Sequence, residues 1–380
     1  RMNTAYDPWY GYNALTKGYV WVGHYRTTDT NYQQLLNFNH VIGLHSIDVL
    51  LGHEYSMQSQ TSLSADKKNV ALYGTNTELS GAIINGDMGS DISKYNVEGF
   101  FMRAQYDYDN RYYAEFSFRY DGSSKFRSDL RWGFFPSFSL GWRVSEEAFF
   151  DGIRDQFNNL KLRFSYGQLG NQNVGYYDYI RKISIGSQNY LFGGDKPTTA
   201  TISAPVASDL SWERSIHKNL GVDMSFLNNR LAFSADFYIR DTKDMLTAGV
   251  ALPGVYGADP PKMNSADLRT KGYELSLNWR DEFQLLRRPF SYSVTLTFND
   301  YVSNITKFDN PDRSFAKKYY EGMRWGEIWG YRVEGLFRDQ DDIDSHATQS
   351  FLQSSDKVTR PGQVKFADLN DCLLYTSDAA

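Results

Sequence analysis

The sequence predicts an all-β protein, part of an antiparallel transmembrane β-barrel with long extracellular loops. Three observations predict this fold class. Segments of about ten residues alternate apolar and polar side chains, their charged residues stay almost entirely on the polar parity, and long connections alternate with short ones. A soluble β-sandwich could present the polar side to bulk water, but it would need neither the charge parity nor the alternating connection lengths.

The clearest alternation lies between residues 111 and 166. Its first segment opposes two sets of side chains: Tyr112, Ala114, Phe116, Phe118 and Tyr120 against Tyr113, Glu115, Ser117, Arg119 and Asp121. After a polar stretch at 122–131, a second apolar set follows: Phe134, Pro136, Phe138, Leu140, Trp142 and Val144. A third set comprises Leu160, Leu162, Phe164 and Tyr166. A period of two is the signature of a strand with two unlike faces.

Further strands are expected on both sides of this stretch, to give roughly ten in all. They lie near residues 19–25, 31–39, 46–51, 100–108, 220–226, 231–240, 273–279 and 290–298. Residues 54–94 and 241–270 lack clear periodicity and are predicted to be long loops, and everything after Asn299 is predicted to be loop or a small subdomain. Short turns are expected near 39–44, 109–110, 145–158, 228–229 and 281–289.

The composition agrees with strands that cross a membrane. Aromatic residues make up 16% of the chain, with 28 Tyr and 25 Phe, and this load suits the aromatic girdles of a barrel. Trp132, Trp142 and Trp279 are expected in such girdles. No run of roughly 18 apolar residues exists, so a transmembrane helix is excluded. The net charge of −5 is too small to argue for nucleic acid, and a single cysteine, Cys372, excludes an internal disulfide framework.

Charged residues on the polar parity predict a water-filled lumen. An arginine facing lipid at the bilayer midplane would cost about 2–4 kcal/mol, so the lumen is the natural place for such side chains. Four arginines are therefore expected to face the lumen: Arg103, Arg119, Arg143 and Arg163. Glu98 breaks the parity, and we expect it at the loop end of its strand, where the cost is small.

No catalytic residues stand out, and neither a metal site nor a cofactor site is predicted. The six histidines lack metal-ligand spacing, and the acidic run Asp339–Asp344 lacks the glycine of an EF-hand and is predicted to be a solvated loop. The protein is therefore not expected to be an enzyme. Aromatic loop residues could stack on sugar rings or peptide side chains, or could simply pack the loops together: Tyr176, Tyr177, Tyr179, Trp325, Trp329 and Tyr331.

Specific motifs resemble those of the SusC/RagA family of TonB-dependent receptors. The most specific block comprises YDGSSKF at 120–126, RWGFFPSFSLGWRVSEE at 131–147 and LKLRFSYGQLGNQ at 160–172. Weaker echoes follow in family order, among them TKGYELSL at 270–277, GYRVEGLF at 330–337 and PGQVKFADLN at 361–370.

The resemblance implies a plugged barrel of roughly 22 strands in the outer membrane of a Gram-negative cell. It also implies active import of glycan or peptide fragments, with a SusD-like surface lipoprotein as a lid and the TonB–ExbB–ExbD complex as the energy source. The partners would then be these proteins, outer-membrane lipid and an oligosaccharide or peptide substrate, without nucleic acid. A passive porin and a soluble β-rich carbohydrate-binding protein remain the alternatives.

The sequence is interpreted as a fragment. Residues 1–371 would belong to the receptor's barrel domain, while the plug domain and the C-terminal strands would be absent. After residue 371 the sequence departs from the family pattern, so residues 372–380 are expected to be a non-native tail from sequencing or assembly.

Overall fold

The structure is a computed structural model of the chain. It describes residues 2–6, 18–70, 78–154, 156–187, 192, 194, 196–203, 205–249, 253, 255, 257, 260–311, 313, 319–328, 330–347, 349 and 359–367. Two compact units are distinguished, Arg1–Trp325 and Gly326–Ala380, and each is described by itself. Within the described residues, no helix is long and apolar enough to cross a membrane. The proposed tail at 372–380 and Trp329 lie outside the described part.

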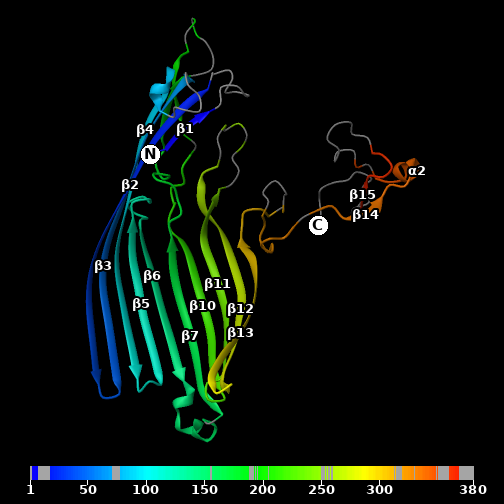
Figure 1. Cartoon of the computed structure of the whole chain (residues 1–380). Coiled ribbons are helices and arrows are strands. Elements are labelled where there is room, and N and C mark those ends of the chain that lie inside the picture. The colour runs from blue at the N-terminus through cyan, green and yellow to red at the C-terminus, as the bar shows by residue number, and fades with distance from the viewer. Residues whose placement is uncertain are drawn as a thin grey trace. The chain divides into compact units, whose positions relative to one another are not determined.

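In the described part of the first unit, eleven strands form one antiparallel sheet (Figure 1). In spatial order they are β1 (Met2–Tyr6), β2 (Tyr19–Ile42), β3 (His45–Val70), β4 (Ala82–Tyr108), β5 (Tyr112–Ser123), β6 (Trp132–Arg143), β7 (Phe157–Asn171), β10 (Glu213–Phe226), β11 (Leu231–Ala248), β12 (Lys262–Leu285) and β13 (Arg288–Lys307). Nearly every strand therefore pairs with its neighbour in sequence. The exception is between β7 and β10, where β8 (Ile183–Ser187) and β9 (Thr198–Ile202) form a separate hairpin.

The tight turns all occur at the same end of the strands, as the alternation of connection lengths predicts. Asp109 and Asn110 both have positive φ, 54° and 55°, between β4 and β5. Two consecutive left-handed residues match the right-handed twist of a hairpin, and Asp and Asn tolerate that conformation. Leu286 and Arg287 adopt the same geometry between β12 and β13, with φ of 52° and 63°.

The predicted loops were too long. β3 continues to Val70 and β4 begins at Ala82, so most of the predicted loop at 54–94 is strand. β11 likewise extends to Ala248, β12 begins at Lys262, and β13 runs to Lys307 instead of ending near Asn299. β2, β3 and β4 reach well beyond β5 and β6 (Figure 1). In the projecting part polar residues occupy both faces, so the alternation that marks a spanning strand is absent there.

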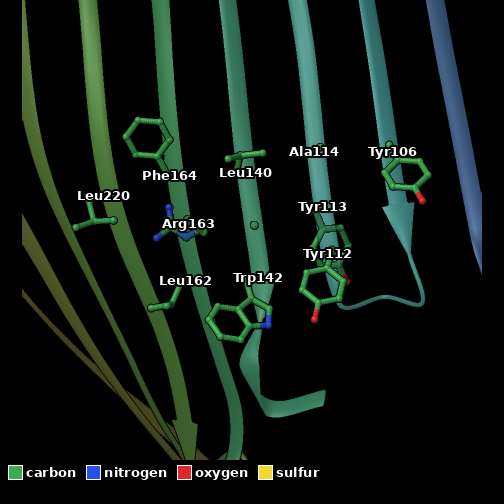
Figure 2. A pocket seen from close by; sticks show the side chains of 11 residues that line it. Tyr106, Tyr112, Tyr113, Ala114, Leu140, Trp142, Leu162, Arg163, Phe164 and Leu220 are labelled. Carbon is green, nitrogen blue, oxygen red and sulfur yellow. The ribbon is translucent and has the colours of Figure 1, made fainter. Parts of the chain in front are cut away.

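One side of the sheet is apolar and exposed. Cross-strand partners on this side form continuous rows, such as Leu140, Phe164, Leu220, Phe237 and Tyr273. Leu220 keeps 58% of its surface exposed and Leu296 keeps 63%. So large an apolar face is unfavourable in water and is the expected face toward acyl chains. A depression of about 470 Å³ lies on this side and is lined by residues of β4 to β10, among them Tyr112, Leu140 and Trp142 (Figure 2).

Glu98 does not lie at a strand end, contrary to the prediction. It occupies the interior of β4 on the apolar parity, and its Oε1 lies 3.2 Å from Nε2 of His53. Eleven residues separate it from the turn at Asp109, roughly 28 Å along a tilted strand. Since an apolar band is about 25 Å tall, Glu98 lies at its outer margin. Its cost is small because the strand continues past the lipid.

The hydrophobic core of the first unit lies under the long loops. Phe135, on the polar parity of β6, packs with Phe126, Val174, Leu210 and Trp212. Its ring occupies space left by two glycines: a Cβ at Gly133 or Gly170 would lie 2.4 Å or 2.2 Å from the ring. Trp212 Nε1 also donates to the Arg131 carbonyl at 2.8 Å. This core attaches the connections 124–131 and 172–212 to the sheet.

The described part of the second unit contains a two-stranded antiparallel sheet and a short helix. β14 (Val333–Leu336) pairs with β15 (Val364–Phe366), and α2 spans Gln340–Asp344. The acidic run is thus a capped helix, not the predicted loop: the Asp339 side chain accepts a hydrogen bond from the Asp342 amide. Lys365 Nζ donates to the Asp342 carboxylate at 2.8 Å, and this bond lowers the pKa of Asp342 to about 2.

The membrane assignment predicts that an arginine substitution is tolerated on the polar side of the sheet and destabilising on the apolar side. Leu220→Arg should lower the free energy of unfolding by about 2–4 kcal/mol, because the charge would enter the apolar band. Urea titration of the protein folded into lipid vesicles measures the change. Ser276→Arg, on the polar parity of β12, is the matched control and should have little effect. Equal losses for both variants would contradict a lipid-facing side.

Candidate functional site

The four candidate arginines share the polar side of the sheet, and each lies close to a carboxylate. Arg163 contacts Asp223 and Asp236, and Arg119 contacts Asp121 and Glu54. Arg103 lies 3.8 Å from Asp48, and Arg143 lies 3.5 Å from Glu146. These carboxylates therefore compensate the positive charges of the four arginines. This pairing makes them candidates to brace the sheet as well as to contact a plug or cargo.

Arg163 forms the most extensive of these contacts. Its Nε and Nη2 donate to Asp223 at 2.7 and 3.0 Å, and its Nη1 and Nη2 donate to Asp236 at 3.0 Å each. Asn219 donates to the same Asp236 carboxylate at 2.7 Å. Four charge-assisted hydrogen bonds thus join β7, β10 and β11.

A glycine makes this bridge possible. Arg163 and Asp236 both pair with Gly221, which lies between them on β10. The two partners therefore lie two strand spacings apart, roughly 10 Å. A Cβ at Gly221 would lie 2.6 Å from Oδ1 of Asp236 and 2.7 Å from Cζ of Arg163. Only a residue without a side chain leaves the guanidinium free to cross the strand.

The same arrangement recurs at Arg119. Its Nε and Nη2 donate to Asp121 at 3.0 and 2.9 Å, and Nη2 also reaches Glu54 at 3.3 Å. Gly99 pairs with both Glu54 and Asp121. A Cβ at Gly99 would lie 2.2 Å from Asp121 Oδ1. Here too, a glycine on the middle strand opens the space that an ion pair crosses.

The loop after β7 folds over the polar side of the sheet. Tyr176 Oη donates to Oε1 of Gln58 at 2.9 Å, and its ring lies 5.6 Å from the ring of Tyr95. Gln58 on β3 and Tyr95 on β4 are cross-strand partners. Lys125 Nζ lies over both rings, 4.6 Å from the centre of Tyr95 and 5.3 Å from that of Tyr176. We call Tyr95, Lys125 and Tyr176 the aromatic–lysine cluster.

Burial lowers the pKa of Lys125 from its ordinary value, while the Asp178 carboxylate acts in the opposite direction. Asp178 accepts a hydrogen bond from the Gly175 amide at 2.8 Å and lies 3.7 Å from Nζ of Lys262. Two aromatic faces and a partly desolvated cation therefore meet at one place on the inner wall. Such a place can stack a ring and donate to a polar oxygen.

The predicted tyrosine group is divided between structural and exposed positions. Tyr176 contacts Gln58 on β3, and Tyr179 packs against the hydrophobic core. Tyr177 keeps 36% of its surface exposed and has a φ of 61°. Lys182 Nζ lies 5.9 Å from its ring. Of the three, Tyr177 therefore has the face that is most available to a ligand.

The second predicted aromatic group divides between the two units. Trp325 is exposed and stacks on Tyr319, with ring centres 5.3 Å apart and planes 14° apart. Tyr331, in the other unit, lies 5.2 Å from the Phe366 ring. Trp329 is outside the described residues.

Sequence reasoning missed Tyr95 and Lys125. Tyr95 lies between the predicted loop at 54–94 and the predicted strand at 100–108, so its place on β4 was not recognised. Lys125 belongs to the YDGSSKF motif that supports the resemblance, but its position beside two tyrosines depends on residues about 30 and 50 positions away.

The chain matches the sequence model of a family described as TonB dependent receptor-like, beta-barrel, over residues 1–370. It is 28% identical over 360 residues to TonB-dependent receptor P3 of Formosa agariphila, covering 90% of this chain and 34% of that protein. It is 33% identical over 229 residues to TonB-dependent receptor SusC of Bacteroides thetaiotaomicron, covering 58% of this chain and 22% of that protein.

Solved structures give the same picture. A structure of the RagAB peptide transporter aligns with a TM-score of 0.67 and 27% identity, over 77% of this chain and 32% of that one. The RagAB peptide importer in its closed-closed state aligns with a TM-score of 0.72 over 92% of this chain and 38% of that one. Its 24% identity supports the fold alone. The chain thus spans 22% to 38% of the length of these proteins.

Substitution of Gly221, which lies beneath the Arg163 ion pairs, tests how much these ion pairs stabilise the protein. Gly221→Ala should lower the free energy of unfolding by about 1.5–3 kcal/mol, the range for lost hydrogen bonds to charged groups. Gly141→Ala is the matched control in the same cross-strand row, since its Cβ would meet nothing closer than 3.3 Å. Urea titration in lipid vesicles compares the two. In an Arg163→Met background the effect of Gly221→Ala should shrink, and an unchanged effect would contradict the bridge.

Proposed function

We propose, because the chain belongs to the TonB-dependent receptor-like β-barrel family, that it forms part of the wall of an active importer of glycan or peptide fragments. The match to the family over residues 1–370 is the observation that carries this proposal. The protein is an outer-membrane β-barrel protein, and its family consists of receptors and transporters. The class of cargo is suggested by the relatives, one of which is named a peptide transporter and another SusC.

The two unlike faces of the sheet support an import role. The apolar side can face lipid, while the polar side carries the ion pairs and the aromatic–lysine cluster, as a hydrated path requires. In this proposal the protein does no covalent chemistry on its cargo. Tyr177 would stack on a sugar ring or an apolar peptide side chain, and the cluster of Tyr95, Lys125 and Tyr176 would hold the loop in place.

The proposed partners follow from the family. A SusD-like surface lipoprotein would close over the extracellular side, and the TonB–ExbB–ExbD complex would act on a plug inside the barrel. Arg103, Arg119, Arg143 and Arg163 would contact that plug or line the path that its movement opens. Since each already pairs with a carboxylate, we expect them to keep the wall rigid while the plug moves.

Transport measurements in cells separate this function from the alternatives. Cells with the intact protein should take up its cargo only when TonB is functional, and deletion of the gene should abolish growth on that cargo. In planar bilayers the intact protein should show little steady conductance because a plug closes it. A large constant conductance with TonB-independent uptake would instead identify a passive porin. Folding without detergent or lipid would favour a soluble carbohydrate-binding protein.

Tyr177 should contribute to cargo affinity through its ring. Tyr177→Ala should weaken binding about 2- to 10-fold, which corresponds to about 0.5–1.5 kcal/mol for an aromatic contact. Tyr177→Phe keeps the ring and should bind as the unchanged protein does. Isothermal titration of the detergent-solubilised intact protein with its cargo measures both. Equal binding by all three proteins would exclude a stacking role for Tyr177.

A further inference from the structure

The connection between β6 and β7 is longer than the other connections at the same end of the strands. Residues 144–154 contain two short 3₁₀ helices, η2 (Val144–Glu146) and η3 (Ala148–Ile153), where the other described connections at this end of the strands are tight turns. We call residues 144–154 the connector. Short turns mark the periplasmic end of an outer-membrane barrel, so the connector lies at that end.

Two sets of contacts hold the connector against the lipid-facing side of the sheet. Glu147 Oε1 accepts hydrogen bonds from Tyr112 Oη at 2.5 Å and from Trp142 Nε1 at 3.0 Å. Both donors belong to the apolar parity, next to the depression in Figure 2. These two hydrogen bonds lower the pKa of the Glu147 carboxyl from its ordinary value, and the bond from Tyr112 has the larger effect. Tyr and Trp with a polar tip are typical residues of a membrane interface.

The second set is a chain of aromatic rings. Phe150 is buried, and its ring lies edge-on to Phe157 at 6.1 Å. Phe157 in turn lies 4.5 Å from Phe226, which is on the apolar parity of β10. The helix η3 is therefore fixed to the same side of the wall that faces acyl chains.

Two apolar side chains of η3 are exposed. Phe149 keeps 71% of its surface exposed and Ile153 keeps 45%. In a 3₁₀ helix, residues three apart lie on the same side. Ile153 therefore lies on the side of Phe150, and Phe149 lies on an adjacent side. Asp151 lies on the remaining side, where it pairs with Arg154 at 3.1 Å. Arg154 also donates to the Ser145 carbonyl at 2.8 Å, so the charges of η3 are satisfied within the connector.

We propose that the connector is a membrane anchor that inserts Phe149 and Ile153 into the phospholipids of the periplasmic leaflet. Continuity selects lipid as the occupant, because the exposed apolar sides of η3 extend the lipid-facing surface at Tyr112, Trp142 and Phe226. The connector would fix the height of the wall in the membrane. Arg154 is paired internally, so insertion depends on apolar contact and not on lipid charge. This inference rests on the outer-membrane location and is independent of the cargo.

Spin-label accessibility tests the anchor in the intact protein. Phe149→Cys and Ile153→Cys are introduced with all native cysteines replaced, labelled with a nitroxide, and folded into vesicles of phosphatidylcholine and phosphatidylethanolamine. Power saturation then compares collisions with oxygen, which concentrates in acyl chains, and with a water-soluble nickel chelate. Both labels should favour oxygen over the chelate several-fold more than a label at Asn229→Cys, in the polar turn between β10 and β11.

Leu220→Cys, on the lipid-facing side, is the reference for membrane exposure. A label at position 149 that collides with the chelate as freely as the label at position 229 would overturn the proposal. A label shielded from both reagents would overturn it too, since that result means cover by protein, either a second copy or a periplasmic partner. Phe149→Ser keeps the hydrogen bonds of Glu147 and should fold normally, but it should reduce the oxygen preference of a label at 153.

Discussion

The unbroken antiparallel ladder is the constraint on which the rest of the structure depends. Inside a bilayer no water can satisfy backbone N–H and C=O groups, so each spanning strand must bond to its neighbours over the whole crossing. Once that ladder fixes the register, every second residue faces lipid and the others face water. The rows of Leu140, Phe164 and Leu220 on one side and the paired arginines on the other are both consequences of this register.

The spacing of paired strands also explains why two glycines are needed for the ion pairs on the polar side of the sheet. Cross-strand partners are held about 4.8 Å apart, so a charge two strands away is out of reach unless the strand between offers no side chain. Gly221 and Gly99 provide that opening for Arg163 and Arg119. The Arg163 bridge joins β7, β10 and β11, and the Arg119 bridge joins β5 to β3 across β4. The polar lining is thereby kept in a defined arrangement.

At the two ends of the strands, the segments outside the lipid use different means of attachment. On the long-loop side, Trp212 and Phe135 form a small core, and Tyr176 bonds to the wall through Gln58. On the short-turn side, Glu147 binds the interfacial tyrosine and tryptophan. The loop that carries Tyr177 is thus positioned by packing, while the connector is positioned by the membrane-facing girdle.

The sequence by itself determined the parity of the strands, the side with short turns and the family, because a lipid–water boundary forces a period of two on each spanning segment. It did not determine where β3 and β4 extend past the lipid, since polar residues on both faces leave no periodic signal there. Nor did it identify the partners of the charges. Arg163 and Asp236 are 73 residues apart, and only the alignment of separate strands brings them together across Gly221. The pairing of strands is a tertiary property, and so are the ion pairs and the aromatic–lysine cluster that depend on it.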